Sequence, residues 1–435
     1  MKMNNTAMKK ILAMGLAGAM IFSMAACGTK ETTEAAEDVT EEVTEVVQEI
    51  DQEMIVTTAN VTSDGAIDAS DLFTERDLTQ TADLTDAEYY TLQDGQDIEI
   101  TSAGVYVLSG TATDVTIKVN AGDEDKVQIV LNGVNITNSD SPAIYVVNAD
   151  KVFVTTTDTE NTLSITGTFT ADGDTNTDAA IFSKDDLILN GVGTLNISST
   201  ANGVTSKDDL KITGGNININ CEADAMEANE SVAIADGNIT IVTNKDGIHA
   251  ENDEDDTVGY VYICGGNIKI EAADDGIHGT TITQIDGGTF DIDTYGEGIE
   301  ATIVQINGGT VDVYAADDGI NASAKSSAYY PEIQINGGDV TISMGQGDTD
   351  ALDSNGGLTI TGGTINITAQ SPFDYDGTGT LSGGTVIVNG QEVTQLSNQM
   401  MGGGMMGGQM GGGPGGMGGG FGGMGGGFGG PGFGG

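Results

Sequence analysis

Apolar and polar residues alternate in one recurring signature between residues 212 and 388. It reads aliphatic-x-Gly-Gly-x-aliphatic-x-aliphatic, as in Ile212–Ile219, Ile263–Ile270 and Ile306–Val313. Alternation with a period of two is typical of a strand with one buried face, and a Gly pair permits the positive φ of a tight corner. Each copy therefore predicts a corner followed by a half-buried strand.

The copies form a repeat. Their first Gly, or Asp236 in one variant, stands at positions separated by 22, 29, 22, 21, 29, 25 and 21 residues. A second short strand follows each copy, as at Gly247–Ala250, and a third leads back to the next Gly pair. Three strands and three corners in about 22 residues are typical of one rung of a β-helix. The sequence predicts an all-β fold, a right-handed parallel β-helix, since a propeller blade needs about 40 residues.

The start of the chain differs from the repeats. Residues 1–26 combine Lys2, Lys9 and Lys10 with an apolar stretch, which is typical of an export signal. Small residues precede Cys27 as in the lipobox of bacterial lipoproteins, so we expect lipid attachment at Cys27. The alternative is an ordinary cleaved signal. With the lipid, the protein is expected outside the cell, anchored to the bacterial surface.

The remaining segments have distinct compositions. Residues 27–60 are acidic and predict a solvated tether, and residues 61–95 are expected to cap the first rung, because an open sheet edge invites pairing. Residues 96–395 are assigned to the β-helix. Residues 396–435 are a tail rich in Gly and Met that cannot form a packed core. No other apolar run reaches the about 18 residues of a membrane span.

Composition narrows the choice of partner. The 435 residues include 66 Asp+Glu against 14 Lys+Arg, for a formal charge of -52. Such a surface repels phosphate backbones, which excludes a nucleic-acid partner. Arg76 is the single arginine, so repeated bidentate capture of carboxylates is excluded as well.

Acids recur at fixed offsets from the Gly pairs. A first column, ten residues after each pair, reads Asp224, Asp246, Asp275, Glu297 and Asp318, with Asp350 and Asp374 continuing it. A second column, three residues later, includes Glu227, His249, His278, Glu300, Asn321 and Asp353. Carboxylates on rungs about 4.8 Å apart repel one another unless cations lie between them. Calcium takes 6–8 oxygen ligands, so we predict Ca²⁺ at both columns, with a solvated acidic stripe as the alternative.

The two longest rungs carry insertions with candidate chemistry. One contains Asp253 and Asp255 in an acidic cluster, which either binds calcium or is a solvated loop. The other contains Tyr329 and Tyr330, which either stack on sugars or pack the insertion onto the helix wall. His249 and His278 occupy equivalent positions on successive rungs. Their carboxylate neighbours favour a structural ladder over a transition-metal site.

Several segments indicate a family. Leu72–Leu78, Ser183–Leu187, Ser206–Leu210 and Asp246–Asp256, together with the Gly-Gly rungs, resemble the bacterial surface family of carbohydrate-binding domain-containing proteins. The family is related in fold to pectate lyases. The resemblance covers about residues 70–390. It implies a calcium-binding right-handed β-helix that binds cellulose and acidic glycans such as polygalacturonate, without established lyase activity.

These observations predict a lipid-anchored, calcium-dependent protein that binds plant-type or acidic polysaccharide. The first alternative is a calcium-dependent polysaccharide lyase of the pectate lyase type. Such lyases typically use an Arg or Lys base, and here only lysines such as Lys184 and Lys207 lie within the repeats. The second alternative is a surface adhesin or spacer with structural calcium. No catalytic residue is assigned.

Overall fold

The computed structural model describes residues 65–252, 254–346 and 349–398. The predictions for residues 1–64 and 399–435, Cys27 among them, and for Asp253 lie outside these ranges. The described residues form 36 strands and no helix. Within them, no helix is long and apolar enough to cross a membrane.

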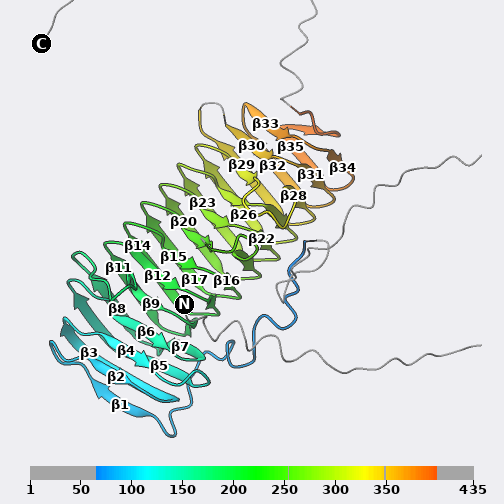
Figure 1. Cartoon of the computed structure of the whole chain (residues 1–435). Coiled ribbons are helices and arrows are strands. Elements are labelled where there is room, and N and C mark those ends of the chain that lie inside the picture. The colour runs from blue at the N-terminus through cyan, green and yellow to red at the C-terminus, as the bar shows by residue number, and fades with distance from the viewer. Residues whose placement is uncertain (1–64, 253, 347–348, 399–435) are drawn as a thin grey trace, which may run out of the picture. The chain divides into compact units, whose positions relative to one another are not determined.

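The strands stack into three faces, each with parallel pairing between rungs (Figure 1). One face is a separate 12-stranded sheet. Its strands are β2 (Ile98–Ile100), β4 (Ile117–Asn120), β6 (Ile144–Asn148), β9 (Ala179–Ser183), β12 (Asn202–Ser206), β15 (Met226–Ala228), β18 (Ile248–Ala250), β21 (Ile277–Gly279), β24 (Ile299–Ala301), β27 (Ile320–Ala322), β30 (Asp350–Ser354) and β33 (Ser371–Tyr375).

The second and third faces belong to one 24-stranded sheet, because the long strands β3 and β5 run through both. The second face comprises β1 (Glu88–Thr91), β3 (Gly104–Thr113), β5 (Lys126–Asn138), β7 (Lys151–Thr156), β10 (Asp186–Gly191), β13 (Asp209–Ile212), β16 (Ser231–Ile234), β19 (Tyr260–Ile263), β22 (Ile282–Ile285), β25 (Ile303–Ile306), β28 (Glu332–Ile335), β31 (Gly357–Ile360) and β34 (Gly379–Leu381).

The third face continues from the far halves of β3 and β5. It comprises β8 (Glu160–Ile165), β11 (Thr194–Ser199), β14 (Asn216–Cys221), β17 (Asn238–Thr243), β20 (Asn267–Ala272), β23 (Thr289–Thr294), β26 (Thr310–Ala315), β29 (Asp339–Met344), β32 (Thr364–Thr368), β35 (Thr385–Val388) and β36 (Gln391–Val393). Only β36 pairs antiparallel in this stack of described strands, against β35. The predicted all-β class and parallel β-helix are confirmed.

Inward aliphatic side chains form one continuous core along the stack. On the third face, Ile241, Ile270 and Ile292 pair in register from β17 to β20 to β23, and each is buried. The residues between them are exposed, as the alternating pattern predicts. Each rung therefore buries its apolar side chains only by stacking on its neighbours.

Gly pairs form the corner between the second and third faces. The second glycine of the pair has positive φ, for example +90° at Gly215 and +104° at Gly288, as predicted. The first glycine lies against the rung below. A Cβ added at Gly308 would lie 2.5 Å from the carbonyl oxygen of Asp286.

We expect Gly308→Ala to destabilise the protein by about 1–3 kcal/mol, because the new methyl group forces two rungs apart. Gly122→Ala is the matched control, since the nearest atom there is a side-chain oxygen of Asp125 at 3.1 Å, which can move. Urea unfolding followed by circular dichroism measures both changes. Equal stability of the two variants would contradict close rung packing at the Gly corner.

Residues 65–80, here called the strap, cross the outer side of the second face (Figure 1). The Ile67 amide donates to Gln284 on β22, Lys211 on β13 donates to the Leu72 carbonyl, and Asn190 on β10 donates to the Asp77 carbonyl. Leu72 and Ile67 pack there against Tyr260 and Tyr262. The strap therefore differs from the predicted cap: it binds the side of many rungs, and β1 forms the first strand.

Candidate functional site

The 12-stranded sheet carries the second predicted column on its outer side. Register pairs Glu227 with His249, His249 with His278, and His278 with Glu300. Further pairs are Glu300 with Asn321, Asn321 with Asp353, and Asp353 with Asp374. The column is confirmed as a spatial row, with one correction. Asp374 extends this second column rather than the first, because Asp350 pairs with Ser371.

The first column lies at the corner that precedes the 12-stranded sheet, and its acids bind backbone. The Asp246 amide donates to Asp224 Oδ1 at 3.1 Å, and the Asp275 amide donates to Asp246 Oδ1 at 2.9 Å. The Glu297 amide donates to Asp275 Oδ1 at 3.0 Å, and the Asp350 amide to Asp318 Oδ1 at 2.9 Å. Buried backbone amides need such partners, so the recurrence of this column has a structural cause that the sequence analysis missed.

Lysines pair with the acids of the earlier rungs. Lys207 Nζ lies 3.0 Å from Glu227 Oε1, and Lys245 Nζ lies 2.8 Å from Asp224 Oδ2. Further along, Lys325 Nζ lies 2.8 Å from Glu300 Oε2. The sequence analysis treated Lys207 only as a possible base and did not single out Lys325, which follows β27 in an insertion. Protein cations therefore balance part of the acidic columns.

His249 and His278 are both buried, with ring centroids 4.7 Å apart. Nδ1 of His249 lies 3.0 Å from Asp246 Oδ2, and its Nε2 lies 2.9 Å from Glu251 Oε2. Burial lowers the pKa of His249, but interactions with three carboxylates outweigh that effect and raise the pKa to about 11. The pKa of His278 is lowered by burial and by the neighbouring charge of His249.

The later rungs hold four carboxylates without such balance. These residues, Glu297, Asp318, Asp353 and Asp374, together with the amide of Asn321 between them, are here called the anionic column. Burial is the largest cause of raised pKa values in this column, and repulsion from nearby carboxylates adds to it. The pKa is raised to about 8 for Glu297, about 6 for Asp318 and about 7 for Asp353. None of these three forms a salt bridge with a described residue. Oδ1 of Asn321 and Oδ1 of Asp374 are buried without a hydrogen bond.

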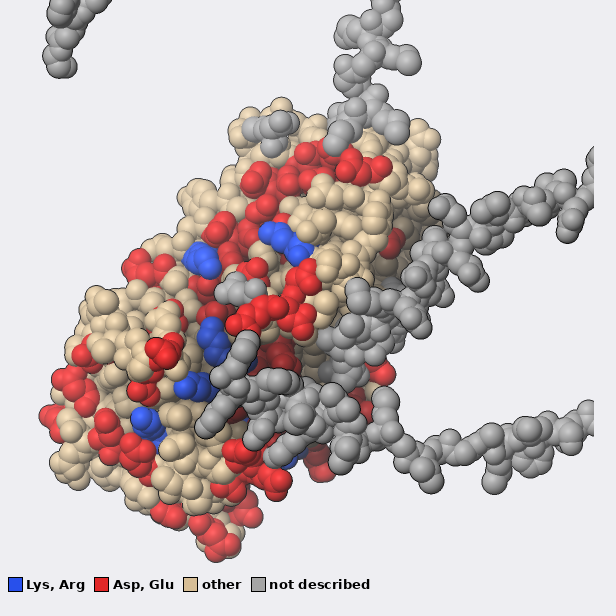
Figure 2. Space-filling model, viewed as in Figure 1, with Lys and Arg blue, Asp and Glu red and all other residues tan. Residues whose placement is uncertain are grey.

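Two adjoining hollows, of about 510 and 780 Å³, form one charged groove over β9 to β18. They share Lys207, Asp224, Glu227 and Lys245. Figure 2 shows lysines lying among carboxylates along this face. Lys184 adds a further cation, held about 6.0 Å from the Tyr145 ring.

The acidic insertion and the tyrosine insertion lie in different places. Glu251, Asn252 and Glu254 form a wall of the groove, whereas Asp255 is exposed and binds its own turn at Thr257. Tyr329 packs against the cluster beneath the strap, and Tyr330 is 68% exposed. Neither tyrosine lines the charged groove. The predicted sugar-stacking role therefore stays a prediction for Tyr330, while Tyr329 serves packing.

Together these features define a class of protein: a parallel β-helix whose separate sheet carries a charged groove. The family model of "Carbohydrate-binding domain-containing protein" matches residues 94–349, more than half of the chain. The chain belongs to this family, as the sequence resemblance predicted.

The chain is also similar to individual proteins of known sequence or structure. A "Carbohydrate-binding domain-containing protein" of Acetivibrio thermocellus is 38% identical over 125 residues, which cover 28% of this chain and 44% of that protein. The match thus spans less than half of the relative's length. A solved structure described as "polysaccharide lyase-like protein from C. thermocellum, Gadolinium derivative" is 28% identical, with a TM-score of 0.43 over 67% of this chain and 99% of that one.

Proposed function

We propose that this chain is an extracellular protein that binds acidic polysaccharide in the charged groove, with calcium bound in the anionic column. The observation that supports it most is the groove itself, which joins cations and hydrogen-bonding side chains in an open hollow on a rigid sheet. An extended glycan matches such a surface because its successive rings pass successive rungs. The family to which the chain belongs supports carbohydrate as the ligand class.

Lys184 is the cation most available to a sugar carboxylate. It forms no salt bridge with any described residue, whereas Lys207 is shared with Glu227. Their positions are equivalent on adjacent rungs, because Ser183 pairs with Ser206. Because the backbones of these two rungs lie about 4.8 Å apart, the two ammonium groups can reach one uronate carboxylate or two successive ones. Asn229, half-buried in the wall of the groove, offers an amide group for a ring hydroxyl nearby.

Calcium fits the anionic column by the chemistry of its donors. The column offers carboxylate and amide oxygens, the ligands that calcium prefers. Two of its oxygens, on Asn321 and Asp374, are buried and have no hydrogen bond, which is costly unless a cation or water contacts them. We infer that Asp318, Asn321, Asp353 and Asp374 contribute ligands there. Bound calcium would also join the column to carboxylates of the glycan.

The lipid anchor at Cys27 completes the proposal. The apolar start of the chain and the small residues before Cys27 support export and attachment at the bacterial surface. Labelling cells with a radioactive fatty acid, followed by capture of the protein, tests the attachment against a Cys27→Ser variant.

Pull-down on insoluble polygalacturonate and on cellulose, each with calcium or with EDTA, tests the binding. We expect retention on polygalacturonate with calcium. Replacing Lys184 and Lys207 by Ala should weaken it about 10- to 100-fold, as expected for lost hydrogen bonds to a charged group. Lys269→Ala is the matched control, because Lys269 lies on the third face away from the groove. Unchanged binding by the double variant would overturn the groove as the site.

The same experiment separates the alternatives. Release of an unsaturated, ultraviolet-absorbing product from polygalacturonate would favour a lyase. The pKa values of Lys245 and Lys325 are raised by their carboxylate partners, which outweigh burial, so both lysines hold their protons and are poor bases. Retention on no polysaccharide would favour an adhesin or spacer.

A further inference from the structure

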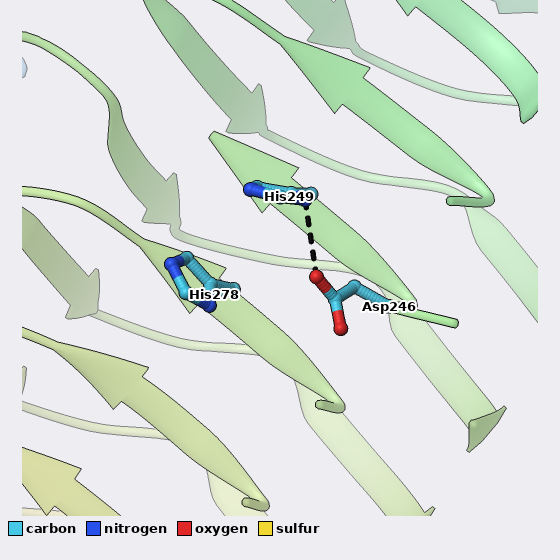
Figure 3. Close-up of side chains that lie close together, drawn as sticks. All are labelled: Asp246, His249 and His278. Carbon is cyan, nitrogen blue, oxygen red and sulfur yellow. Dashed lines mark ion pairs between the residues drawn. The ribbon is translucent and has the colours of Figure 1, made fainter. Parts of the chain in front are cut away.

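Two imidazoles and a carboxylate meet beside the charged groove. Figure 3 shows Asp246 directed at His249 on β18, with His278 on the adjacent strand β21. One ligand atom from each of Asp246, His249 and His278 lies within 4.8 Å of the other two. Ligand atoms around a tetrahedral ion at about 2.1 Å are about 3.4 Å apart, so small side-chain rotations close the gap.

The ring of His249 is oriented by a second carboxylate. Its Nε2 lies 2.9 Å from Glu251 Oε2, which favours a proton on Nε2 and makes Nδ1 the nitrogen that binds a metal ion once the ion displaces the Nδ1 proton. Nδ1 is buried and makes no hydrogen bond, although Asp246 Oδ2 is only 3.0 Å away. A metal-binding histidine almost always has such a carboxylate on its other nitrogen.

His278 is held in a similar way on the next rung. Its Nδ1 lies 3.0 Å from Asp275 Oδ2 and 3.4 Å from Glu300 Oε2. Both histidine residues are 8% exposed, so their rings are fixed by packing rather than free in solvent. A buried donor set that is already oriented loses little conformational freedom when an ion binds.

We propose that Asp246, His249 and His278 bind one divalent transition-metal ion of the zinc class. Two imidazole nitrogens and one carboxylate oxygen suit zinc, whereas calcium prefers oxygen alone, so this site is distinct from the anionic column. His249 borders the groove through Glu251 and Asn252, which gives the ion an entry path and leaves its remaining coordination position open to water or a sugar hydroxyl. The proposal does not depend on glycan binding.

Calorimetric titration of the full chain with Zn²⁺, in the presence of excess Ca²⁺, tests the proposal. We expect one equivalent to bind, because both rings are needed for one ion. Co²⁺ should give the visible absorption of a four-coordinate site with nitrogen ligands, which a structural ladder of ion pairs would not produce. His249→Ala and His278→Ala should each abolish this absorption.

A more conservative substitution separates loss of the metal site from loss of the fold. Glu251→Gln keeps the size of the side chain on a half-exposed loop and should weaken Zn²⁺ binding about 10- to 100-fold, as measured for partners of metal ligands. Glu254→Gln in the same groove wall is the matched control and should bind as the parent does. Equal Zn²⁺ affinity of the Glu251 and Glu254 variants, Zn²⁺ binding that survives loss of both histidines, or no binding by the parent would overturn the site.

Discussion

Calcium should raise the melting temperature of the EDTA-treated protein by several degrees, and by more at about pH 8.5 than at about pH 5.5. Glu297, Asp318 and Asp353 have pKa values raised to about 8, 6 and 7. Acids with a raised folded-state pKa stabilise the fold fully below about pH 4 and lose that contribution as the pH rises through the folded values. The metal-free protein is therefore weakest in base, where calcium replaces the lost protons.

The size of the calcium-dependent gain in stability follows because calcium binds the folded state and not the unfolded state. At 100 times the dissociation constant, a ligand adds about 2.7 kcal/mol to the free energy of unfolding. His249, whose pKa is raised to about 11, weakens the fold in the same direction as the pH rises. Its contribution is common to both calcium conditions, so the calcium-dependent difference reports on the carboxylates. Differential scanning fluorimetry at the two pH values measures it.

Substitutions in the anionic column test whether calcium stabilises the protein by binding there. Asp353→Asn and Asp374→Asn should each raise the melting temperature in EDTA, because one of several crowded charges is removed, and should each reduce the gain from calcium. Asp339→Asn, at an exposed position on the third face, is the matched control. Melting curves that superimpose with calcium and with EDTA at both pH values would rule out calcium in this column.

Leu72→Ala should destabilise the protein by about 2–5 kcal/mol, the cost of a cavity in an apolar cluster. Leu72 belongs to the strap, is 1% exposed, and packs with Tyr260 and Tyr262 of the second face. Leu78, also in the strap but 48% exposed, is the matched control, and Leu78→Ala should change stability by less than about 0.5 kcal/mol. Urea unfolding measures both free energies.

Proteolysis gives an independent measure of the same contacts. If the strap holds the second face, Leu72→Ala should also speed cleavage within residues 65–80. Equal free energies of unfolding for the Leu72 and Leu78 variants would instead mean that the strap lies on the β-helix without stabilising it.

The rungs could be predicted from the sequence because each depends on residues about 22 positions away in a regular register. The Gly-pair corners, the inward aliphatic residues and the row from Glu227 to Asp353 are examples. Asp374 was misplaced because the register depends on the lengths of loops between strands, which spacing alone does not determine. The row of backbone bonds from Asp224 to Asp350 needs the direction of each side chain, which spacing does not contain either.

The position of the strap and the lysine–carboxylate pairs could not be predicted from the local sequence pattern. Ile67 and Gln284, which share a hydrogen bond, are 217 positions apart in the sequence. Nothing in an acidic, irregular segment indicates which face of a solenoid it will cross. Likewise, the sequence shows that Lys325 exists but not that an insertion carries it back to Glu300. These contacts are set by tertiary packing and not by the repeat.

The path of the strap has a mechanical consequence. Gly65 lies beside Ile303 on β25, and the strap then runs back along the stack until Asp77 reaches Lys151 on β7. A pulling force applied ahead of Gly65 would therefore break the strap's contacts one after another, from β25 towards β7, before it loads the first rung. Peeling of this kind needs a small force over a long distance, so the strap would absorb work while the stack behind it stays folded.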